Sequence, residues 1–250
     1  MSSNLILDRK VCIVTGASRG IGLAIAIKFV KEGALVFANA RNAESLSDDL
    51  ASAEKHYPNL TIQYYDVTKS DEVKSAILEV KKLHGRIDVL VNNAGIVSYE
   101  LVALIDFERF HQMLETNVVA VLRITQLVSR IMARQNSGSI INISSIVSTK
   151  GVKGQVSYAA TKGAINAITI AAAKEFAEHT IRVNAVAPGM VGTERLLSIM
   201  GEKFQHKEND IGFGRVASPE EVADVCLFLA SDMSSFVTGQ IIGVDGSTIM

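Results

Sequence analysis

The sequence predicts an α/β fold in which a doubly wound, seven-stranded parallel sheet carries helices on both faces. Short apolar runs alternate with longer helical patterns along the 250 residues. The apolar runs are nearly continuous, which is typical of parallel strands that are buried on both faces. Strands that alternate with helices in this way favour right-handed crossovers and a doubly wound sheet.

The elements follow in order along the chain. The expected strands are residues 11–15, 35–40, 61–65, 89–92, 139–143, 182–186 and 240–244. The expected helices are residues 20–31, 43–56, 70–83, 106–134, 158–178 and 219–230. The last helix has the clearest start, because Pro219 follows Ser218 and two glutamates come next, a pattern typical of a capped first turn.

One domain spanning residues 1–250 is the expected organisation, since the chain has only three prolines, no linker-like stretch and no repeat. Residues 193–213 differ from the rest, because they carry many polar residues and few apolar ones. Such a segment between two core elements is typical of a mobile lid over a substrate. Its basic side chains, which would suit an anionic substrate group, are Arg195, Lys203, His206 and Lys207.

Composition and charge exclude several classes of function. A net charge of −1 and a pI of about 6.5 argue against nucleic acid or an anionic membrane surface as the main partner. No apolar run reaches the roughly 18 residues that a membrane span needs, and residues 1–10 do not resemble a signal peptide. Cys12 and Cys226 lie in apolar contexts, which fits buried thiols and a reducing cytoplasm. The five histidines show no metal-binding spacing, so no metal is expected.

A glycine-rich turn follows the first expected strand and opens the first expected helix. Gly16, Gly20 and Gly22 permit a sharp turn and the close approach of a pyrophosphate. The helix N-terminus adds free N–H groups and a partial positive charge. The spacing differs from the commoner G-x-G-x-x-G, and a purely structural turn is the alternative. Its place between strand and helix favours a Rossmann-type dinucleotide site.

The end of the second expected strand bears on the choice of dinucleotide. An acidic residue there commonly binds the ribose 2′-hydroxyl of NAD, but residues 37–42 contain no carboxylate. Arg41 is present instead, and Arg19 lies within the glycine turn. Two guanidinium groups suit a 2′-phosphate, which favours NADP(H). The alternative is that both arginines are solvated surface residues.

Tyr158 and Lys162 form a candidate proton-transfer pair. Residues four apart share one face of a helix, so the lysine ammonium should lie near the tyrosine. A nearby positive charge lowers the pKa of a phenol from its usual value near 10, which suits general acid catalysis. Ser145, beyond the strand at 139–143, would donate to a carbonyl oxygen. Each residue also has a structural alternative. The Tyr158 and Lys162 pair would be exposed surface residues, Ser145 would cap a helix or turn, and Asn117 would be a polar helix residue where elements pack together.

Taken together, these motifs resemble the short-chain dehydrogenase/reductase family over nearly the whole chain. The resemblance implies catalytic roles for Asn117, Ser145, Tyr158 and Lys162, with Asn117 anchoring a water that relays protons. Ser145 is preferred to Ser144 because the family's serine stands thirteen residues before its tyrosine. The implied cofactor-binding residues are Gly16, Ser18, Arg19, Gly20, Ile21, Gly22, Arg41, Asp66, Val67, Asn93, Ala94, Gly95, Tyr158, Lys162, Pro188, Gly189, Val191 and Thr193.

Within the family, the chain is most similar to bacterial 3-oxoacyl-[acyl-carrier-protein] reductases. The resemblance implies NADP(H)-dependent reduction of a ketone, with an acyl thioester as the expected substrate and acyl carrier protein as a possible partner. Two departures are Asp245-Gly246-Ser247 in place of a doubled glycine, and a weakly basic loop at 133–138. The alternatives are a dehydrogenase of a sugar, small alcohol or cyclic ketone, and a regulatory protein that senses the cofactor. Apolar surface on residues 117–134 and 164–176, together with the resemblance, predicts a homotetramer.

Overall fold

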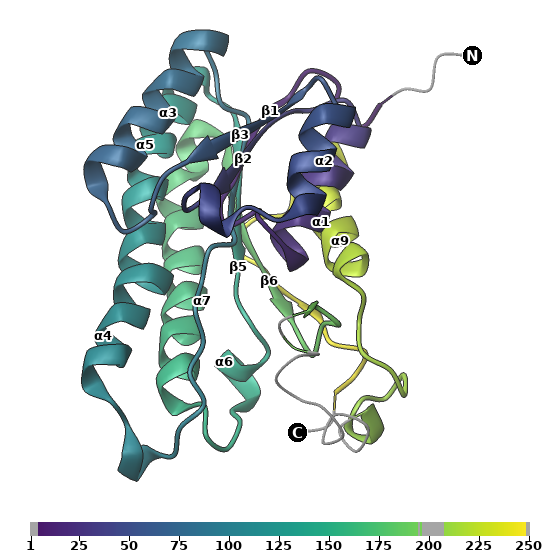
Figure 1. Cartoon of the computed structure of the whole chain (residues 1–250). Coiled ribbons are helices and arrows are strands. Elements are labelled where there is room, and N and C mark those ends of the chain that lie inside the picture. The colour runs from purple at the N-terminus through teal and green to yellow at the C-terminus, as the bar shows by residue number, and fades with distance from the viewer. Residues whose placement is uncertain (1–4, 195, 197–207, 249–250) are drawn as a thin grey trace.

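The fold is built on one parallel sheet. The computed structural model describes residues 5–194, 196 and 208–248. Within them, seven strands lie in the order β3-β2-β1-β4-β5-β6-β7 (Figure 1). The strands are β1 (Val11–Val14), β2 (Leu35–Ala40), β3 (Leu60–Tyr64), β4 (Val89–Asn92), β5 (Gly138–Ile143), β6 (Ile181–Pro188) and β7 (Ile241–Val244). The predicted doubly wound α/β fold is therefore confirmed, and each expected strand is present with its ends within two residues of the prediction.

Helices cover both faces of the sheet and create two cores (Figure 1). They are α1 (Gly20–Lys31), α2 (Asp48–His56), α3 (Ser70–His84), α4 (Phe107–Leu114), α5 (Ala120–Gln135), α6 (Val147–Lys150), α7 (Val156–Phe176) and α9 (Pro219–Ala230). Successive strand residues face opposite sides, so Cys12 and Val14 pack with α1 and α9. Val11 and Ile13 pack instead with α3 and α5. Burial on both faces explains why the central strands are mostly apolar.

Two predicted helices differ from the observed ones. The helix expected at 43–56 begins only at α2, because Asn42 caps a short 3-10 turn and Ser47 starts a new helix by accepting a hydrogen bond from Leu50 N (3.2 Å). The helix expected at 106–134 is divided into α4 and α5 by a π-helical turn, η3 (Glu115–Val119). The short helix α6 was not predicted.

The predicted lid at 193–213 lies largely outside the described residues. Arg195, Lys203, His206 and Lys207 fall in that part of the chain, so the prediction for them stays untested. The described end of the segment is held by the C-terminal turn, since Gly212 N and Phe213 N donate to Ser247 O and Gly246 O (3.2 and 3.1 Å). Among the described helices, none is long and apolar enough to cross a membrane.

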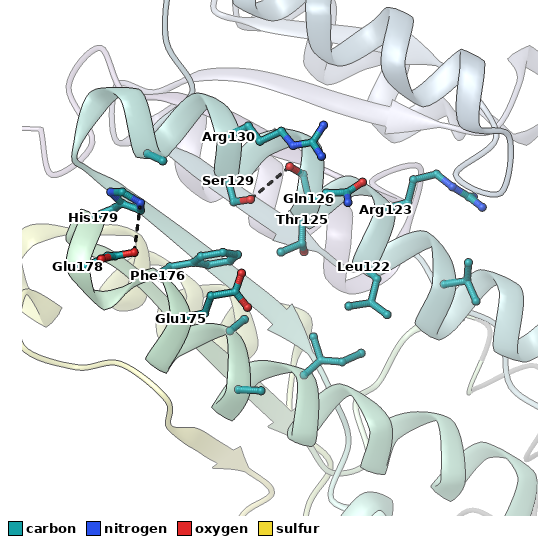
Figure 2. Close-up of a pocket in the computed structure, with 15 residues that line it drawn as sticks. Leu122, Arg123, Thr125, Gln126, Ser129, Arg130, Glu175, Phe176, Glu178 and His179 are labelled. Atoms are coloured by element: carbon teal, nitrogen blue, oxygen red, sulfur yellow. Dashed lines mark hydrogen bonds and ion pairs between the residues drawn. The ribbon is translucent and has the colours of Figure 1, made fainter.

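A groove of about 770 Å³ runs along the outer surface of α5 and α7. Figure 2 shows Arg123 and Arg130 on the α5 side, and Glu175 and Phe176 on the α7 side. The exposed Leu122 adds apolar surface to this groove. This face of the protein therefore carries basic groups on one helix, acidic groups on its neighbour, and apolar contacts between them.

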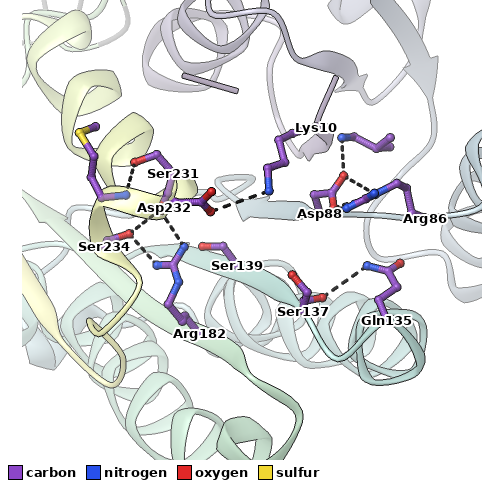
Figure 3. Close-up of polar contacts among 12 residues, drawn as sticks. Lys10, Arg86, Asp88, Gln135, Ser137, Ser139, Arg182, Ser231, Asp232 and Ser234 are labelled. Carbon is purple, nitrogen blue, oxygen red and sulfur yellow. Dashed lines mark hydrogen bonds and ion pairs between the residues drawn. The ribbon is translucent and has the colours of Figure 1, made fainter. Parts of the chain in front are cut away.

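A polar network ties the amino ends of the strands together (Figure 3). The carboxylate of Asp88, which is buried, accepts hydrogen bonds from Val11 N (2.8 Å) and Arg86 Nε (2.9 Å). Arg182 Nη1 donates to Ser234 Oγ at 2.7 Å on the other side of the sheet. These contacts give charged and polar groups at the amino edge their hydrogen-bond partners. They do not involve the carboxyl edge of the sheet, where β1, β4 and β5 end.

Candidate active site

A cleft of about 770 Å³ lies at the carboxyl ends of the strands and brings nearly all predicted site residues together. The predicted residues that line it are Gly16, Ser18, Arg19, Gly20, Ile21, Gly22, Arg41, Val67, Asn93, Ala94, Gly95, Ser145, Tyr158, Lys162, Pro188, Gly189, Val191 and Thr193. Asp66 and Asn117 are not part of the lining. The cleft is at the crevice outside the strand ends, where doubly wound sheets bind their ligands.

The glycine turn is shaped by close contact with the loop after β4. Gly16 has a φ of +61°, and a Cβ there would come within 2.8 Å of Ala94 Cα. A Cβ on Gly22 would come within 2.4 Å of Asn93 Nδ2. Asn93 Nδ2 in turn donates to the carbonyl of Gly16 (2.9 Å). Glycine is therefore required at both positions, because a larger residue would separate the turn from this loop.

The N-terminus of α1 faces the cleft with its amides available. Arg19 occupies the N-cap position, and its side chain makes no capping hydrogen bond. Gly20, Ile21 and Gly22 line the cleft just beyond it. A helix N-terminus without a cap offers N–H groups and a partial positive charge to phosphates. The glycine cradle and these amides fit the pyrophosphate of a dinucleotide.

Asn39, which the sequence analysis missed, fixes the base of this turn. It is buried near the end of β2, where its Oδ1 accepts from Gly16 N (3.1 Å) and its Nδ2 donates to Tyr65 O (2.8 Å). The side chain thus links the glycine turn to the end of β3. A polar residue within an otherwise apolar strand was the signal that marked it, since a buried amide needs partners.

Arg41 and Asp66 lie at the far end of the cleft. Arg41 Nε is 3.8 Å from Asp66 Oδ2, and the Arg41 side chain is 62% exposed. Partial burial raises the pKa of Asp66, but hydrogen bonds from Thr68 and the charge of Arg41 outweigh it and hold that pKa below its usual value. Asp66 therefore stays anionic and bonds to its own turn, while Arg41 and Arg19 both belong to the cleft wall.

Tyr158 and Lys162 lie together on the face of α7 that borders the cleft. Lys162 Nζ is 5.7 Å from the centroid of the Tyr158 ring and donates to Ile143 O at 2.6 Å. The lysine is 5% exposed. Burial lowers its pKa to about 8, because the charged form loses hydration. The helical spacing predicted from the sequence thus places an ammonium beside a phenol at the cleft.

The two adjacent serines have different surroundings. Ser144 Oγ donates to Asn166 Oδ1 at 2.6 Å, so its hydroxyl faces α7. Ser145 Oγ accepts from Val147 N at 3.3 Å, and a hydroxyl that accepts still has its own hydrogen to donate. Ser145 Oγ therefore bonds the turn that leads into α6, which is compatible with the alternative of a turn cap, and also keeps a hydrogen to donate to a ligand in the cleft.

Asn117 is buried in the π-helical turn η3, behind the cleft. Its Oδ1 accepts from Ile96 N (2.9 Å), and its Nδ2 donates to Ile96 O (2.8 Å) and Thr161 Oγ1 (3.1 Å). The side chain thus connects the loop after β4 with α7. The contact on α7 is close to Tyr158, because Thr161 Oγ1 itself donates to Tyr158 O (2.8 Å). The predicted role in proton relay stays a prediction.

Comparisons with known proteins identify the class to which this fold and site belong. A family model described as "Enoyl-(Acyl carrier protein) reductase" matches residues 16–247. The chain belongs to the short-chain dehydrogenase/reductase family, whose members are nicotinamide-dependent oxidoreductases.

Individual relatives cover nearly the whole chain. A 3-oxoacyl-[acyl-carrier-protein] reductase of Thermotoga maritima is 43% identical over 98% of this chain and 99% of the relative. A 3alpha-hydroxysteroid dehydrogenase of Mediterraneibacter gnavus is 38% identical over 97% and 98%. The crystal structure of a putative short-chain alcohol dehydrogenase from Sinorhizobium meliloti has a TM-score of 0.90 at 33% identity, and covers 98% of both chains. The predicted family resemblance is confirmed.

Proposed function

We propose that the protein is an NADP(H)-dependent reductase of ketones, with a 3-oxoacyl thioester as the preferred substrate. One observation carries the proposal. Tyr158, Lys162 and Ser145 line the same cleft as the glycine turn and the open N-terminus of α1. A dinucleotide held by the turn and a carbonyl held by the serine and tyrosine would therefore meet in one place.

The chain's own residues prepare the carbonyl for reduction. Ser145 and Tyr158 donate hydrogen bonds to the carbonyl oxygen, and Tyr158 gives it a proton as negative charge develops there. The Lys162 ammonium favours the phenolate that this transfer leaves behind. When bound, the nicotinamide supplies the hydride, so the protein's task is to orient and polarise. Asn117 orders the segment behind Tyr158 and helps to supply its next proton.

The preference for NADP(H) rests on charge at the adenine end. Arg41 is exposed and lies beside the cleft, while Arg19 lies at the N-cap of α1. Among the residues that the structure describes, no carboxylate lies closer to either guanidinium than the 3.8 Å contact between Arg41 and Asp66. Two guanidinium groups without tight partners suit the doubly charged 2′-phosphate.

The substrate proposal follows the similar relatives, several of which are named 3-oxoacyl-[acyl-carrier-protein] reductases. A cyclic ketone is the second candidate, because another relative is named a hydroxysteroid dehydrogenase. The cleft continues to the half-exposed Tyr99, and Leu101, Val102, Leu104 and Phe107 expose apolar surface farther along the same segment. That surface favours an apolar acyl chain or ring over a sugar. A sensor of the cofactor is disfavoured by the complete set of Ser145, Tyr158 and Lys162.

A homotetramer is part of the proposal. The groove between α5 and α7 places Arg123 and Arg130 opposite Glu175 and Glu178. Because symmetric dimers bring the same surface of two copies together, the basic helix of one copy would meet the acidic helix of the other around Leu122. Acyl carrier protein would be a second, transient partner. We also place the protein in the cytoplasm, where the buried thiols of Cys12 and Cys226 stay reduced.

The test is the oxidation of NADPH and NADH, followed by absorbance, with a panel of ketones. The panel includes acetoacetyl thioesters with and without acyl carrier protein, a simple β-ketoester, a cyclic ketone and a keto sugar. We expect the thioesters to give the highest kcat/KM with NADPH. Binding of NADPH without oxidation by any member of the panel would support the sensor instead.

A further inference from the structure

Asn166 lies on the catalytic face of α7, four residues after Lys162 and eight after Tyr158. At 3.6 residues per turn, this spacing places the three side chains along one stripe of the helix. Asn166 is not part of the cleft lining, and its amide faces the segment that carries Ser145. Asn166 is therefore placed to act on the conformation of the Ser145 segment rather than on a ligand in the cleft.

The amide of Asn166 contacts the residues on either side of Ser145. Its Oδ1 accepts from Ser144 Oγ at 2.6 Å, and its Nδ2 donates to Ser148 Oγ at 2.8 Å. A hydroxyl has one hydrogen to donate, and Ser148 Oγ directs it to Ser145 O at 2.5 Å. The hydrogen bonds thus run in one direction, from Asn166 through Ser148 to the main chain of Ser145.

The same turn sets the position of the Ser145 hydroxyl. Ser148 N also donates to Ser145 O (3.0 Å), and Val147 N donates to Ser145 Oγ (3.3 Å). The orientation of the hydroxyl therefore depends on the geometry of residues 145–148. That geometry is tied to α7 through Asn166, on the helix that carries Tyr158. Two groups that must grip one carbonyl oxygen are thereby held at a fixed separation.

We propose that Asn166, acting through Ser148, is a positioning residue that aligns Ser145 with Tyr158 for carbonyl reduction. The inference rests on the proposed function, since it concerns the efficiency of that reaction. Asn166 touches neither the substrate nor the cofactor. Its loss should lower kcat while the KM for NADPH stays unchanged, because misplacing a catalytic group weakens the transition state.

The decisive experiment is a set of mutant cycles measured with the best ketone of the panel. We expect Asn166→Leu and Ser148→Ala each to lower kcat by about tenfold, and the double variant to lose no more than either alone. Ser148→Thr, which keeps the hydroxyl, should restore most of the rate. In a Ser145→Ala background, where the aligned hydroxyl is gone, Asn166→Leu should have no further effect. The proposal would be overturned if Asn166→Leu lowered kcat equally with and without the Ser145→Ala change, or if it did not lower kcat when Ser145 is present.

Thr149→Val is the matched control. Thr149 Oγ1 donates to Ile146 O at 3.2 Å in the same short helix, but this hydroxyl has no link to α7 or Ser145. Its replacement should leave kcat within about twofold of wild type, in keeping with the small net effect of one partly buried hydrogen bond. A tenfold loss in this control would show that any disturbance of α6 slows the reaction, and would remove the special role of Asn166.

A second measurement does not depend on turnover. Hydrogen exchange of the Val147 and Ser148 amides reports directly on the bonds to Ser145. We expect faster exchange at both amides in Asn166→Leu and Ser148→Ala, and wild-type exchange in Thr149→Val, with NADPH affinity unchanged in all three. If the wild type reduced no ketone, the proposed function would fail, but hydrogen exchange would still test whether Asn166 and Ser148 hold the turn at Ser145. Unchanged exchange in Asn166→Leu would overturn the positioning role of Asn166, whatever the activity of the variant.

Discussion

The ammonium of Lys162 lies 5.7 Å from the centroid of the Tyr158 ring, and its one hydrogen bond within the described residues, 2.6 Å long, goes to the main chain of Ile143. This contact fixes the lysine to the end of β5 while two of its three N–H donors face elsewhere. The same side chain can therefore support the tyrosine and still reach a ligand in the cleft.

Replacing Tyr158 with phenylalanine removes the proposed proton donor but keeps the ring. We expect kcat for ketone reduction to fall at least about a hundredfold, in line with the usual contribution of general acid catalysis. The affinity for NADPH, measured by fluorescence titration, should change little, because the ring stays in place. A variant that reduced ketones at the wild-type rate would exclude Tyr158 as the acid.

Lys162→Met should change how stability depends on pH. Burial lowers the pKa of Lys162 in the folded protein to about 8, against 10.5 for the ordinary side chain. Between these values the unfolded chain holds the proton more tightly, so the wild type gains stability as the pH rises. Relative to Lys162→Met, the free energy of unfolding of the wild type should rise by about 3 kcal/mol between pH 8 and pH 10.5. Urea unfolding of both proteins at pH 7 and pH 10 measures the difference, and a constant difference would contradict the buried charge.

Arg41→Ala tests the choice of cofactor. Loss of a guanidinium from the 2′-phosphate should raise the KM for NADPH about tenfold, and leave the KM for NADH nearly unchanged, as expected for one charge-assisted contact. Arg134→Ala, at an exposed position near the end of α5, is the control for removing a positive charge. Equal effects of Arg41→Ala on both cofactors would indicate that the arginine does not read the phosphate.

Gly22→Ala tests the close contact under the glycine turn. The new Cβ would come within 2.4 Å of both Asn93 Nδ2 and Gly16 O, so the turn must shift and NADPH affinity should fall at least tenfold, as measured by titration. Gly163→Ala is the contrast, because a Cβ there meets nothing within 4 Å. In a helix that change should stabilise the protein by up to about 1 kcal/mol. Undiminished binding in Gly22→Ala would argue against the cradle.

Leu122→Glu tests the assembly. Leu122 is 47% exposed in the groove between α5 and α7, and a carboxylate there would repel its copy across a symmetric interface and place charge among apolar contacts. We expect light scattering to report a tetramer for the wild type and a smaller species for the variant. Leu83→Glu, at an exposed position on α3, should leave the mass unchanged. A wild-type monomer would refute the proposed tetramer.

The sheet was predictable because most strands are largely apolar, and burial on both faces favours that pattern. The division of the long helix was not, since Thr116 and Asn117 resemble ordinary helical residues. The contacts of Asn117 with Ile96 and Thr161 come from distant parts of the chain. Likewise the start of α2 depends on a cap at Ser47 that competes with continued helix.

The site was predictable where its residues are related by fixed local spacing. Tyr158 and Lys162 share a helix face, and the glycine turn joins a strand to a helix, so both follow from local geometry. Asn39 and Asn166 were missed because their partners belong to other segments. Nothing near Asn166 in the sequence reveals that Ser144 and Ser148 will meet it.

The contacts of Asp88 with Val11 and Arg86 lie at the amino edge of the sheet, whereas Tyr158 borders the cleft at the carboxyl edge. The four residues of β4 separate the two edges by about 13 Å. Contacts that stabilise the fold and the residues proposed to carry the reaction thus lie at opposite ends of the same strands. Because sites this far apart usually act independently, we expect substitutions at the amino edge to change stability without altering substrate preference.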